Sequence, residues 1–412
     1  MKCNPDPHVV STLAKLGAGF DCASAGEIDQ VLGLGVPTSH IAFGHPAKQA
    51  AHVSRAAAQG IEAMMFDGED ELRKCAALYP TAKMVLRLAT DDSHAQCRLS
   101  NKFGAQLAAL PHLLDVAAQL GVDVVGISYH VGSGTRDIVP YLAALKQARE
   151  AFDTAATKGF HFRLLDIGGG FPGWTDEHEV CGALGLPTSA PTFEHIGAAV
   201  AQGITYMFPD ALMPGQVSGM VPAAGAGVRV IAEPGRYMVS DSHTLATTVM
   251  GRRTVKDEGE DARMYYLNDS LYGSFNCLIF DHGEIDAVHV PHATVEAGFE
   301  ATAAALVFSR ATKLRYDDGH AKPAAAEPGH VAQGGLPSIP FEGPVMRSSV
   351  WGQTCDGMDC IVRTAMMPQM EIGDHLVAHT MGAYTSAAAS NFNGFESPDR
   401  VYLEGGEVVD QR

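Results

Sequence analysis

Several residues of this chain could take part in catalysis or bind a cofactor, and most of them lie at or just after the end of a short apolar segment. They are Lys2, Asp21, His130, the triplet Gly168-Gly169-Gly170 and Glu233. A lysine amine can bond covalently to an aldehyde, and an imidazole or a carboxylate beside it can bind or exchange protons. Because a lysine near a chain end is usually only solvated, the prediction depends on the whole set. The set predicts a site for an aldehyde cofactor.

The glycine triplet suits a phosphate-binding turn. Residues 168–170 follow the apolar segment 164–167, and glycine lets backbone N–H groups approach a phosphate closely. An ordinary tight turn has the same composition, so the triplet alone does not decide between the two. The spacing does not match the G-x-G-x-x-G fingerprint of dinucleotide-binding turns, and Pro172 is poorly suited to start a helix on a pyrophosphate.

Two further turns carry groups that complement a pyridine ring and a phosphate. Glu233 could hydrogen-bond a protonated pyridine nitrogen, and Arg236 in the same turn could bind a phosphate through two donors. His130 is followed by Gly-Ser-Gly, so its ring could stack on a pyridine while Ser133 donates to phosphate. A surface ion pair and a structural histidine are the plainer interpretations. Together with Lys2, these turns predict pyridoxal 5'-phosphate as the cofactor.

Three motifs in the second half of the chain carry further reactive groups. Cys355 and Asp356 are adjacent in Trp-Gly-Gln-Thr-Cys-Asp-Gly, where a thiol could donate a proton and a carboxylate could bind an amine. A turn with a buried cysteine is the plainer interpretation. Asp281 follows the apolar segment 277–280, which is predicted to be a strand, and could supply a second anion. Tyr384 adds a phenol.

Composition excludes several classes of partner. The 412-residue chain carries a net charge of −18, which would repel nucleic acids and anionic membranes. No apolar run reaches transmembrane length, and no signal-peptide pattern opens the sequence. The eight cysteines include no C-x-x-C pair, and no H-E-x-x-H motif occurs, so neither a metal site nor a disulfide framework is expected. We therefore predict a cytoplasmic enzyme.

Short apolar segments alternate with amphipathic helical stretches in the first half of the chain. The segments that predict strands are 19–23, 41–43, 62–66, 84–89, 124–131, 164–167 and 228–232. They are apolar enough to be buried on both faces, as parallel strands are. An eighth strand would end at Lys2, and the polar residues follow the strands, where (β/α)8 barrels build their active sites. We predict such a barrel over residues 1–240, with an open doubly wound sheet as the competing architecture.

The pattern changes after about residue 240. Strands without long helices between them are predicted at 243–250, 264–267 and 401–403. Residues 241–412 are therefore expected to form a second, mostly β domain. Within it, residues 287–343 are rich in alanine, glycine and proline, which predicts an inserted, partly disordered loop.

Specific motifs run through nearly the whole chain apart from residues 174–227 and 287–343. In chain order they are KCN, GFDCAS, DDSHAQCRLSNKFG, HVGSG, LDIGGGFPG, AEPGRY, YGSFNC, WGQTCDG, MGAYT and FNGF. This set resembles the eukaryotic-type ornithine decarboxylases, which are pyridoxal-phosphate-dependent enzymes with the alanine-racemase fold. Neither chance nor a shared fold alone would give so many motifs in this order.

The resemblance implies a role for each matching residue. It implies that Lys2 forms the Schiff base with the cofactor, that His130 stacks on the ring and that Glu233 binds the pyridine nitrogen. The residues implied to bind the cofactor are Lys2, Asp21, Glu27, Arg87, His130, Ser133, Gly168, Gly169, Gly170, Glu233, Gly235, Arg236 and Tyr384. Of these, the phosphate ligands are Ser133, Gly170, Arg236 and Tyr384. The residues implied to bind substrate are Asp281, Asp356 and the aromatic Phe392.

The same resemblance implies decarboxylation of L-ornithine to putrescine and CO2, the first step of polyamine biosynthesis. Cys355 would return a proton to the α-carbon. A homodimer with shared active sites is implied, because second-domain residues of this family reach the site of the partner subunit, and antizyme is a further candidate partner. A lysine or arginine decarboxylase and a catalytically dead antizyme-binding homologue remain as alternatives. Asp281 favours ornithine, and the retained cofactor contacts disfavour the dead homologue.

Members of the family carry several tens of residues before the corresponding lysine, including the first barrel strand. We therefore expect the given sequence to be an N-terminally truncated form of a functional enzyme, with Met1 an internal methionine. A barrel that lacks one strand exposes two sheet edges, so the chain as given is expected to be unstable or inactive.

Overall fold

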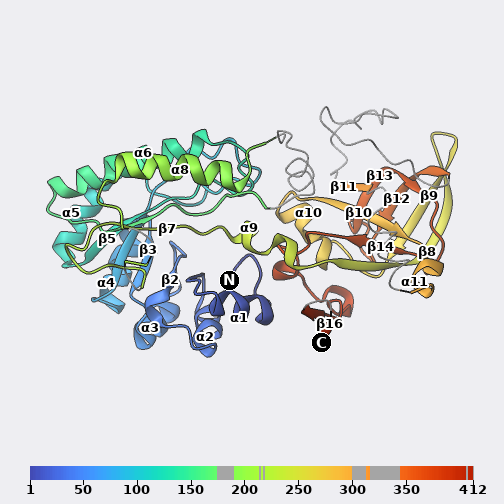
Figure 1. Cartoon of the computed structure of the whole chain (residues 1–412), viewed down its shortest axis with the longest axis horizontal. Helices are drawn as coiled ribbons and strands as arrows, with labels where there is room; N and C mark the ends of the chain where they lie inside the picture. The colour runs from blue at the N-terminus through green and yellow to red at the C-terminus, as the bar shows by residue number, and fades with distance from the viewer. Residues whose placement is uncertain are drawn as a thin grey trace. The chain divides into compact units, whose positions relative to one another are not determined.

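The computed structural model describes residues 1–173, 190–212, 215–216, 219–298, 312–315, 344–404 and 407–411. The chain divides into two compact units, Met1–Val239 and Ser240–Arg412, and each is considered by itself (Figure 1). None of the helices in the described part of the chain is long and apolar enough to cross a membrane.

The first unit is built on a seven-stranded parallel sheet in which every strand pairs with the next one along the chain. Its strands are β1 (Phe20–Cys22), β2 (Ile41–Phe43), β3 (Ala63–Phe66), β4 (Lys83–Arg87), β5 (Asp123–Ser128), β6 (Leu164–Asp166) and β7 (Arg229–Ile231). The predicted alternation of strands and helices is confirmed. Within the described residues the sheet ends at β1 and β7, so the eighth strand and the closure of the barrel stay predictions.

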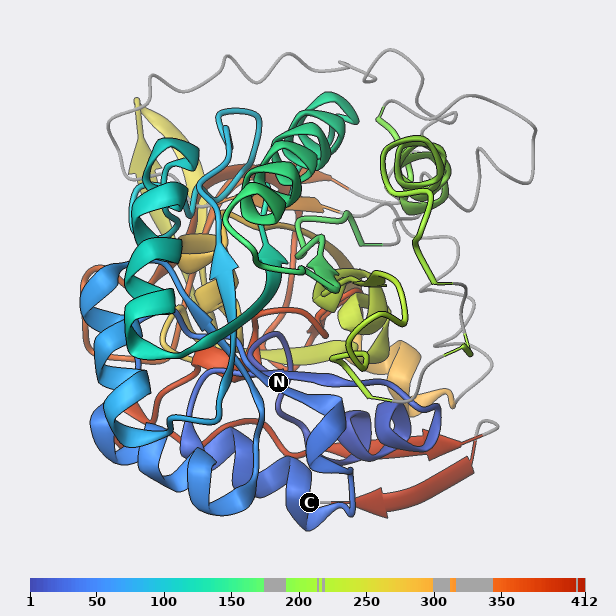
Figure 2. The same cartoon turned by 90° about the vertical axis from the view of Figure 1, so that its left-hand side faces the viewer.

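The helices of this unit mostly connect consecutive strands, and those that do lie along the convex side of the curved sheet (Figure 2). They are α1 (Pro7–Lys15), α2 (Ala25–Gly33), α3 (Ala50–Gln59), α4 (Glu69–Leu78), α5 (Leu110–Leu120), α6 (Val139–Thr157), α8 (Phe193–Met207) and the short α9 (Gly235–Val239). The central strands β2 to β6 are buried on both faces because alternate residues pack on opposite sides, whereas the residues of β7 are only half-buried. Met64 and Met84 join the core beneath the helices, whereas Met65 and Val85 pack in a separate cluster on the other face.

Hydrogen bonds at the start of α1 hold the segment that carries Lys2 in place. The buried Asp6 caps this helix, because its Oδ1 accepts the backbone N–H groups of His8 and Val9. Its own N–H donates to Asn4 Oδ1 over 2.9 Å. Five residues of chain therefore lead into a fixed helix end rather than into a loose terminus.

The second unit is mostly β, as predicted. Its sheet has the order β11-β10-β14-β8-β9-β12-β13. The strands are β8 (Leu245–Asp257), β9 (Glu260–Leu267), β10 (Glu284–Val290), β11 (Thr312–Arg315), β12 (Val345–Trp351), β13 (Cys360–Pro368) and β14 (His375–Ala378), and a separate hairpin joins β15 (Val401–Glu404) to β16 (Glu407–Gln411). The long β8–β9 hairpin closes through Glu258-Gly259, both with positive φ, which suits a tight hairpin turn.

Two sequence predictions for the second unit are wrong, the second of them only for the residues that the structure describes. Residues 277–280 form a short helix, α10 (Cys277–Phe280), because a four-residue apolar run has no periodicity that separates a helix from a strand. The loop predicted over 287–343 instead contains the end of β10, the helix α11 (His292–Glu296) and β11. Residues 299–311 and 316–343 lie outside the described part of the chain, as do 174–189.

Candidate active site

Lys2 and Asp21 form an ion pair, with 2.9 Å between Lys2 Nζ and Asp21 Oδ2. Asp21 lies in β1, and its side chain is 16% exposed, whereas that of Lys2 is 50% exposed. Burial by itself raises the pKa of Asp21, but the positive charges of Lys2 and Arg87 outweigh it and leave this pKa below its usual value. Asp21 is therefore ionised, and its charge favours the protonated amine of Lys2.

His130 follows β5 and is held in one orientation. Its Nδ1 accepts the N–H of Gly132 over 3.0 Å, and its carbonyl accepts the hydroxyl of Thr90 over 2.7 Å. An acceptor at Nδ1 leaves the proton of the neutral ring on Nε2. Burial, followed by the charges of Arg87 and Lys2, lowers the pKa of His130 to about 3. The site therefore contains a neutral, flat imidazole.

The positions of the glycine triplet after β6 do not tolerate a side chain. Gly168 and Gly170 have φ of +62° and +102°, which residues with a Cβ rarely adopt. A Cβ at Gly168 would overlap the carbonyl of Tyr129, and one at Gly169 would lie 2.8 Å from Nε2 of His130. The turn therefore presents bare backbone directly beside the imidazole.

Glu233 follows β7, is half-buried and forms a carboxyl pair with the buried Asp166. The N–H of Glu233 donates to the carbonyl of Gly168 over 2.8 Å, and Asp166 Oδ1 accepts the N–H of Gly168 over 2.9 Å. Burial raises the pKa of Asp166 to about 6 and that of Glu233 well above its usual value. The two carboxyl groups are hydrogen-bonded to each other, and the negative charge of Asp166 also raises the pKa of Glu233.

The predicted site did not include Asp166, although a signal for it was present. It is fully buried and ends β6, with only Ile167 between it and the glycine triplet. A carboxylate at the end of an otherwise apolar strand is costly unless the fold gives it partners. That position alone could have marked Asp166 as part of the site.

Ser133 and Arg236 are in contact, which is expected if both bind the same phosphate. Arg236 Nη2 donates to Ser133 Oγ over 2.9 Å, although the residues are far apart in the sequence. Gly235, beside Arg236, packs against the residue that follows Lys2, because a Cβ there would lie 3.1 Å from the Cβ of Cys3. The turn after β7 and the segment of Lys2 are thus neighbours.

Arg87 and Glu27 take different places around this cluster. Arg87 ends β4, is buried, and has its guanidinium carbon 5.3 Å from the ring centroid of Phe103. Its charge acts on both Asp21 and His130. The carboxylate of Glu27 instead accepts the N–H of Ala23 over 2.5 Å, so it fixes the backbone between β1 and α2.

The second unit gathers three of the predicted residues around Tyr272. The hydroxyl of Tyr272 donates to Asp356 Oδ2, and its ring stacks on Phe392 with 4.4 Å between centroids. The backbone N–H of Cys355 donates to Asn393 Oδ1 over 2.9 Å. Cys355 itself is exposed and carries a free thiol. A thiol, a carboxylate and an aromatic ring therefore share one exposed surface.

The loop that carries Cys355 is anchored by a second buried carboxylate that the sequence prediction did not include. Asp359, which is 1% exposed, accepts the N–H of Leu271 over 2.9 Å and both the N–H and the hydroxyl of Thr354. A Cβ at Gly352 would overlap the same carboxylate, so the loop folds tightly around it. Asp359 thus links Thr354, one residue before the thiol, to the rest of the unit.

The two remaining predicted residues also lie in the second unit. Asp281 directly follows α10 and is buried. Tyr384 has φ of +57°, a left-handed conformation that is costly for an aromatic residue. Such a conformation persists only where the surrounding structure requires it.

Comparison with known proteins identifies the class. Residues 1–240 match the pyridoxal binding domain of the pyridoxal-dependent decarboxylases, and residues 236–382 match the C-terminal sheet domain of the same family. The chain belongs to the pyridoxal-dependent decarboxylases, which confirms the resemblance drawn from the motifs.

Individual relatives are similar along almost the whole chain. The sequence is 39% identical to ornithine decarboxylase of Mus musculus over 98% of this chain and 74% of that protein. It is 38% identical to antizyme inhibitor 2 of Xenopus laevis over 96% of this chain and 73% of that protein. Among solved structures, the arginine decarboxylase of Paramecium bursaria Chlorella virus matches with a TM-score of 0.71 at 31% identity, over 96% of this chain and 85% of that one.

The residues present in the first unit fit pyridoxal phosphate. Asp21 Oδ1 is buried and lacks a hydrogen-bond donor among the described residues, as expected of an acceptor that faces a charged ligand. The bare glycine turn lies near the Ser133–Arg236 pair, which together offer backbone and cationic donors to a phosphate. The amine of Lys2 is the group that an aldehyde requires.

The pH dependence of stability tests the environment of His130. Its folded-state pKa of about 3 lies below the usual 6.5, so below about pH 6.5 the unfolded chain binds a proton that the folded chain does not. Stability of the cofactor-free protein should therefore fall as the pH drops from about 7 to about 5. His130→Gln should reduce this loss, as measured by urea unfolding at both pH values.

The exposed His161→Gln provides the matched control, and it should keep the pH dependence of the wild type. An H130Q variant that loses as much stability on acidification as the wild type would contradict the burial of this ring.

Proposed function

We propose that this chain is a pyridoxal-phosphate-dependent decarboxylase that converts L-ornithine to putrescine and CO2. The observation that carries the proposal is the Lys2–Asp21 pair beside His130 and Glu233, in a chain 39% identical to a protein named ornithine decarboxylase. Lys2 is the covalent anchor in this proposal. When bound, pyridoxal phosphate supplies an electron sink for the negative charge left by loss of CO2.

The residues of the first unit would hold and orient the cofactor. Ser133, Gly170 and Arg236 are the proposed phosphate ligands, with Tyr384 of the second unit as a further one. The neutral ring of His130 would cover one face of the pyridine without adding a positive charge that competes for the electrons. Residues 1–240 would thus form the cofactor-binding domain, and residues 241–412 the second domain.

Glu233 and Asp166 would control a proton at the pyridine nitrogen. Because Asp166 raises the pKa of Glu233, Glu233 would hold a proton beside the pyridine nitrogen, and the carboxyl pair would supply the negative charge that compensates a protonated ring. A protonated ring nitrogen draws electrons more strongly than a neutral one. The hydrogen bond from Gly168 to Asp166 keeps the second carboxyl group in place behind Glu233.

The cluster around Tyr272 would bind the substrate. Asp356, fixed by the hydroxyl of Tyr272, and Asp281 are the proposed anions for the distal ammonium group, and Phe392 is an aromatic wall. The thiol of Cys355 would deliver a proton to the α-carbon after CO2 has left. Lysine is one methylene longer than ornithine, which costs about 1–3 kcal/mol in a fitted site.

We further propose a homodimer in which residues of the second unit complete the site of the partner subunit. The exposed position of Cys355 and Phe392 supports this, because a proton donor and an aromatic wall for a substrate need a covering surface. Antizyme is proposed as a further partner on the strength of the similarity to an antizyme inhibitor. A cytoplasmic location is proposed because the seven cysteines of the described residues carry free thiols.

A direct assay tests the proposed reaction. The purified protein with pyridoxal phosphate is given L-ornithine, L-lysine or L-arginine, and CO2 and the amine product are measured. The kcat/KM for ornithine should exceed that for lysine by about 10-fold or more. Lys2→Ala should abolish both the activity and the visible absorbance of the bound cofactor.

Lys15→Ala, at the exposed end of α1, is the control variant and should keep both properties. Faster turnover of lysine or arginine would reassign the substrate. A protein without any Lys2-dependent absorbance would instead support the antizyme-binding homologue.

Mixing two inactive variants tests the shared site. If Cys355 of one subunit serves the Lys2 of its partner, then Lys2→Ala and Cys355→Ala each fail alone, but half of randomly mixed dimers regain one intact site. Activity should recover to about a quarter of the wild-type value. No recovery after dissociation and remixing would place Cys355 and Lys2 of the same subunit in one site.

A further inference from the structure

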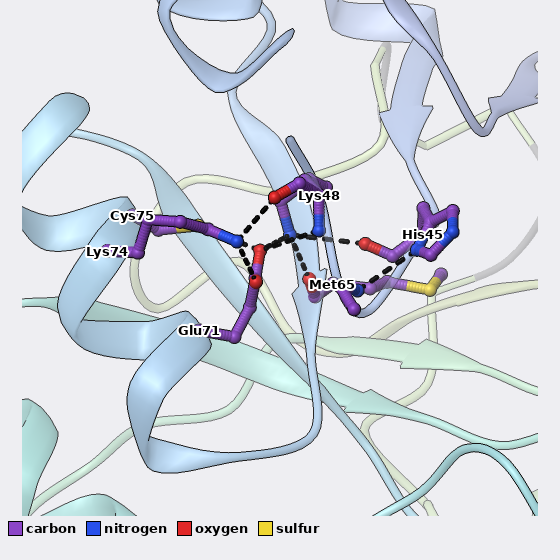
Figure 3. A network of polar contacts seen from close by, with 7 residues as sticks. His45, Lys48, Met65, Glu71, Lys74 and Cys75 are labelled. Atoms are coloured by element: carbon purple, nitrogen blue, oxygen red, sulfur yellow. Dashed lines mark hydrogen bonds and ion pairs between the residues drawn. The ribbon is translucent and has the colours of Figure 1, made fainter. Parts of the chain in front are cut away.

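A buried lysine lies under the turn that follows β2. The side chain of Lys48 is 0% exposed, and its ammonium nitrogen lies 2.8 Å from Glu71 Oε1, 2.5 Å from the carbonyl of Met65 and 3.2 Å from the carbonyl of His45 (Figure 3). An ammonium group has three N–H donors, so all three have acceptors. Since an unpaired buried charge is very costly, these contacts fix Lys48 in one position.

Glu71, on α4, also binds the backbone of Lys48. Its carboxylate accepts the N–H of Lys48 over 3.2 Å, the ammonium of Lys74, and the thiol of Cys75 over 3.5 Å (Figure 3). Burial raises the pKa of Glu71, but the hydrogen bonds from Lys48 and Lys74 outweigh it and leave this pKa below its usual value. A carboxylate with this many donors anchors the turn to the helix.

The turn that Lys48 holds in place packs against the side chain of Asp21. Gly44 begins it, and the N–H of Gly44 donates to the carbonyl of Cys22 over 2.9 Å. A Cβ at Gly44 would overlap Asp21 Oδ1, so the backbone here lies directly against the carboxylate that pairs with Lys2. One of the two carbonyls that Lys48 binds belongs to His45, the residue after Gly44.

The same turn also faces the second charged group near Asp21. The ring of His45 packs edge-on against Phe103, with 5.6 Å between centroids. The guanidinium of Arg87 lies over the same Phe103 ring. A displacement of His45 would therefore disturb Arg87 as well as Asp21.

We propose that Lys48 is a positioning residue, which holds the turn from Gly44 onward so that Asp21 meets the amine of Lys2. This inference rests on the proposed function, because the pair has a catalytic purpose only if Lys2 carries the cofactor. Lys48 itself touches neither Lys2 nor the reacting atoms in this proposal. It acts through His45, Gly44 and Asp21.

The test is the pH titration of the visible absorbance of the Lys2-bound cofactor in the holoenzyme. The charge of Asp21 favours the protonated nitrogen, so a misplaced Asp21 lowers the midpoint. Lys48→Met should lower it by about one pH unit, in the same direction as Asp21→Asn. The other charged or titratable groups around the pair are the amino group of Met1, Arg87, His130 and Glu233, and none of them is substituted in these variants.

Lys74→Met is the control for the loss of one partner of Glu71, because Lys74 binds Glu71 and the carbonyl of Lys48 but not the carbonyl of His45. Both lysine variants should lower the melting temperature, whereas only K48M should shift the absorbance midpoint. A K48M midpoint equal to that of the wild type and of K74M would overturn the proposal, since a merely structural lysine affects stability alone. Wild-type absorbance that persists in Lys2→Ala would overturn the proposed function itself.

Two additional variants keep the test decisive if K48M does not fold. Lys48→Met combined with Glu71→Met removes both buried charges and leaves an apolar pair, which proteins often tolerate. Its midpoint should fall as in K48M. Gly44→Ala leaves the buried ion pair intact but places a methyl group against Asp21, so it should lower the midpoint too. Unchanged midpoints in both would refute the role of this turn.

Discussion

The ion pair between Lys2 and Asp21 is the constraint on which the rest of the structure depends. The amine of Lys2 must remain close to a carboxylate in a place that is partly shielded from water. An isolated segment of chain cannot hold the two groups together. Asp21 is supplied by β1, His130 by the end of β5 and Glu233 by the end of β7. Because parallel strands end at one edge of their sheet, residues far apart in the sequence reach one place.

Buried charges with complete sets of partners hold the turns that carry the reactive groups. Lys48 holds the turn against Asp21, Asp166 holds the glycine turn beside Glu233, and Asp359 holds the loop before Cys355. Each is costly to bury and therefore tolerates little movement. Both units therefore use a buried charged residue to hold a turn, although the first unit is α/β and the second is mostly β.

The sequence predicted the order of strands and helices because each parallel strand is an apolar run with polar turns after it. It also placed His130 and Glu233 near the ends of strands, whereas the strand predicted to end at Lys2 stays a prediction. It did not identify Lys48 or Asp359, because a charged residue in a turn has the same composition whether it is solvated or buried. The short helix 277–280 and the strands within 284–315 were missed, since brief apolar runs and alanine-rich composition do not define a period.

The central claim is that one particular amine carries the cofactor, and chemical trapping tests it most directly. The holoenzyme is reduced with borohydride, digested, and the peptide that bears the pyridoxyl group is identified by mass spectrometry. The account predicts the label on Lys2, whose amine is half exposed beside Asp21. A label on any other lysine, or a protein that cannot be labelled, would contradict it.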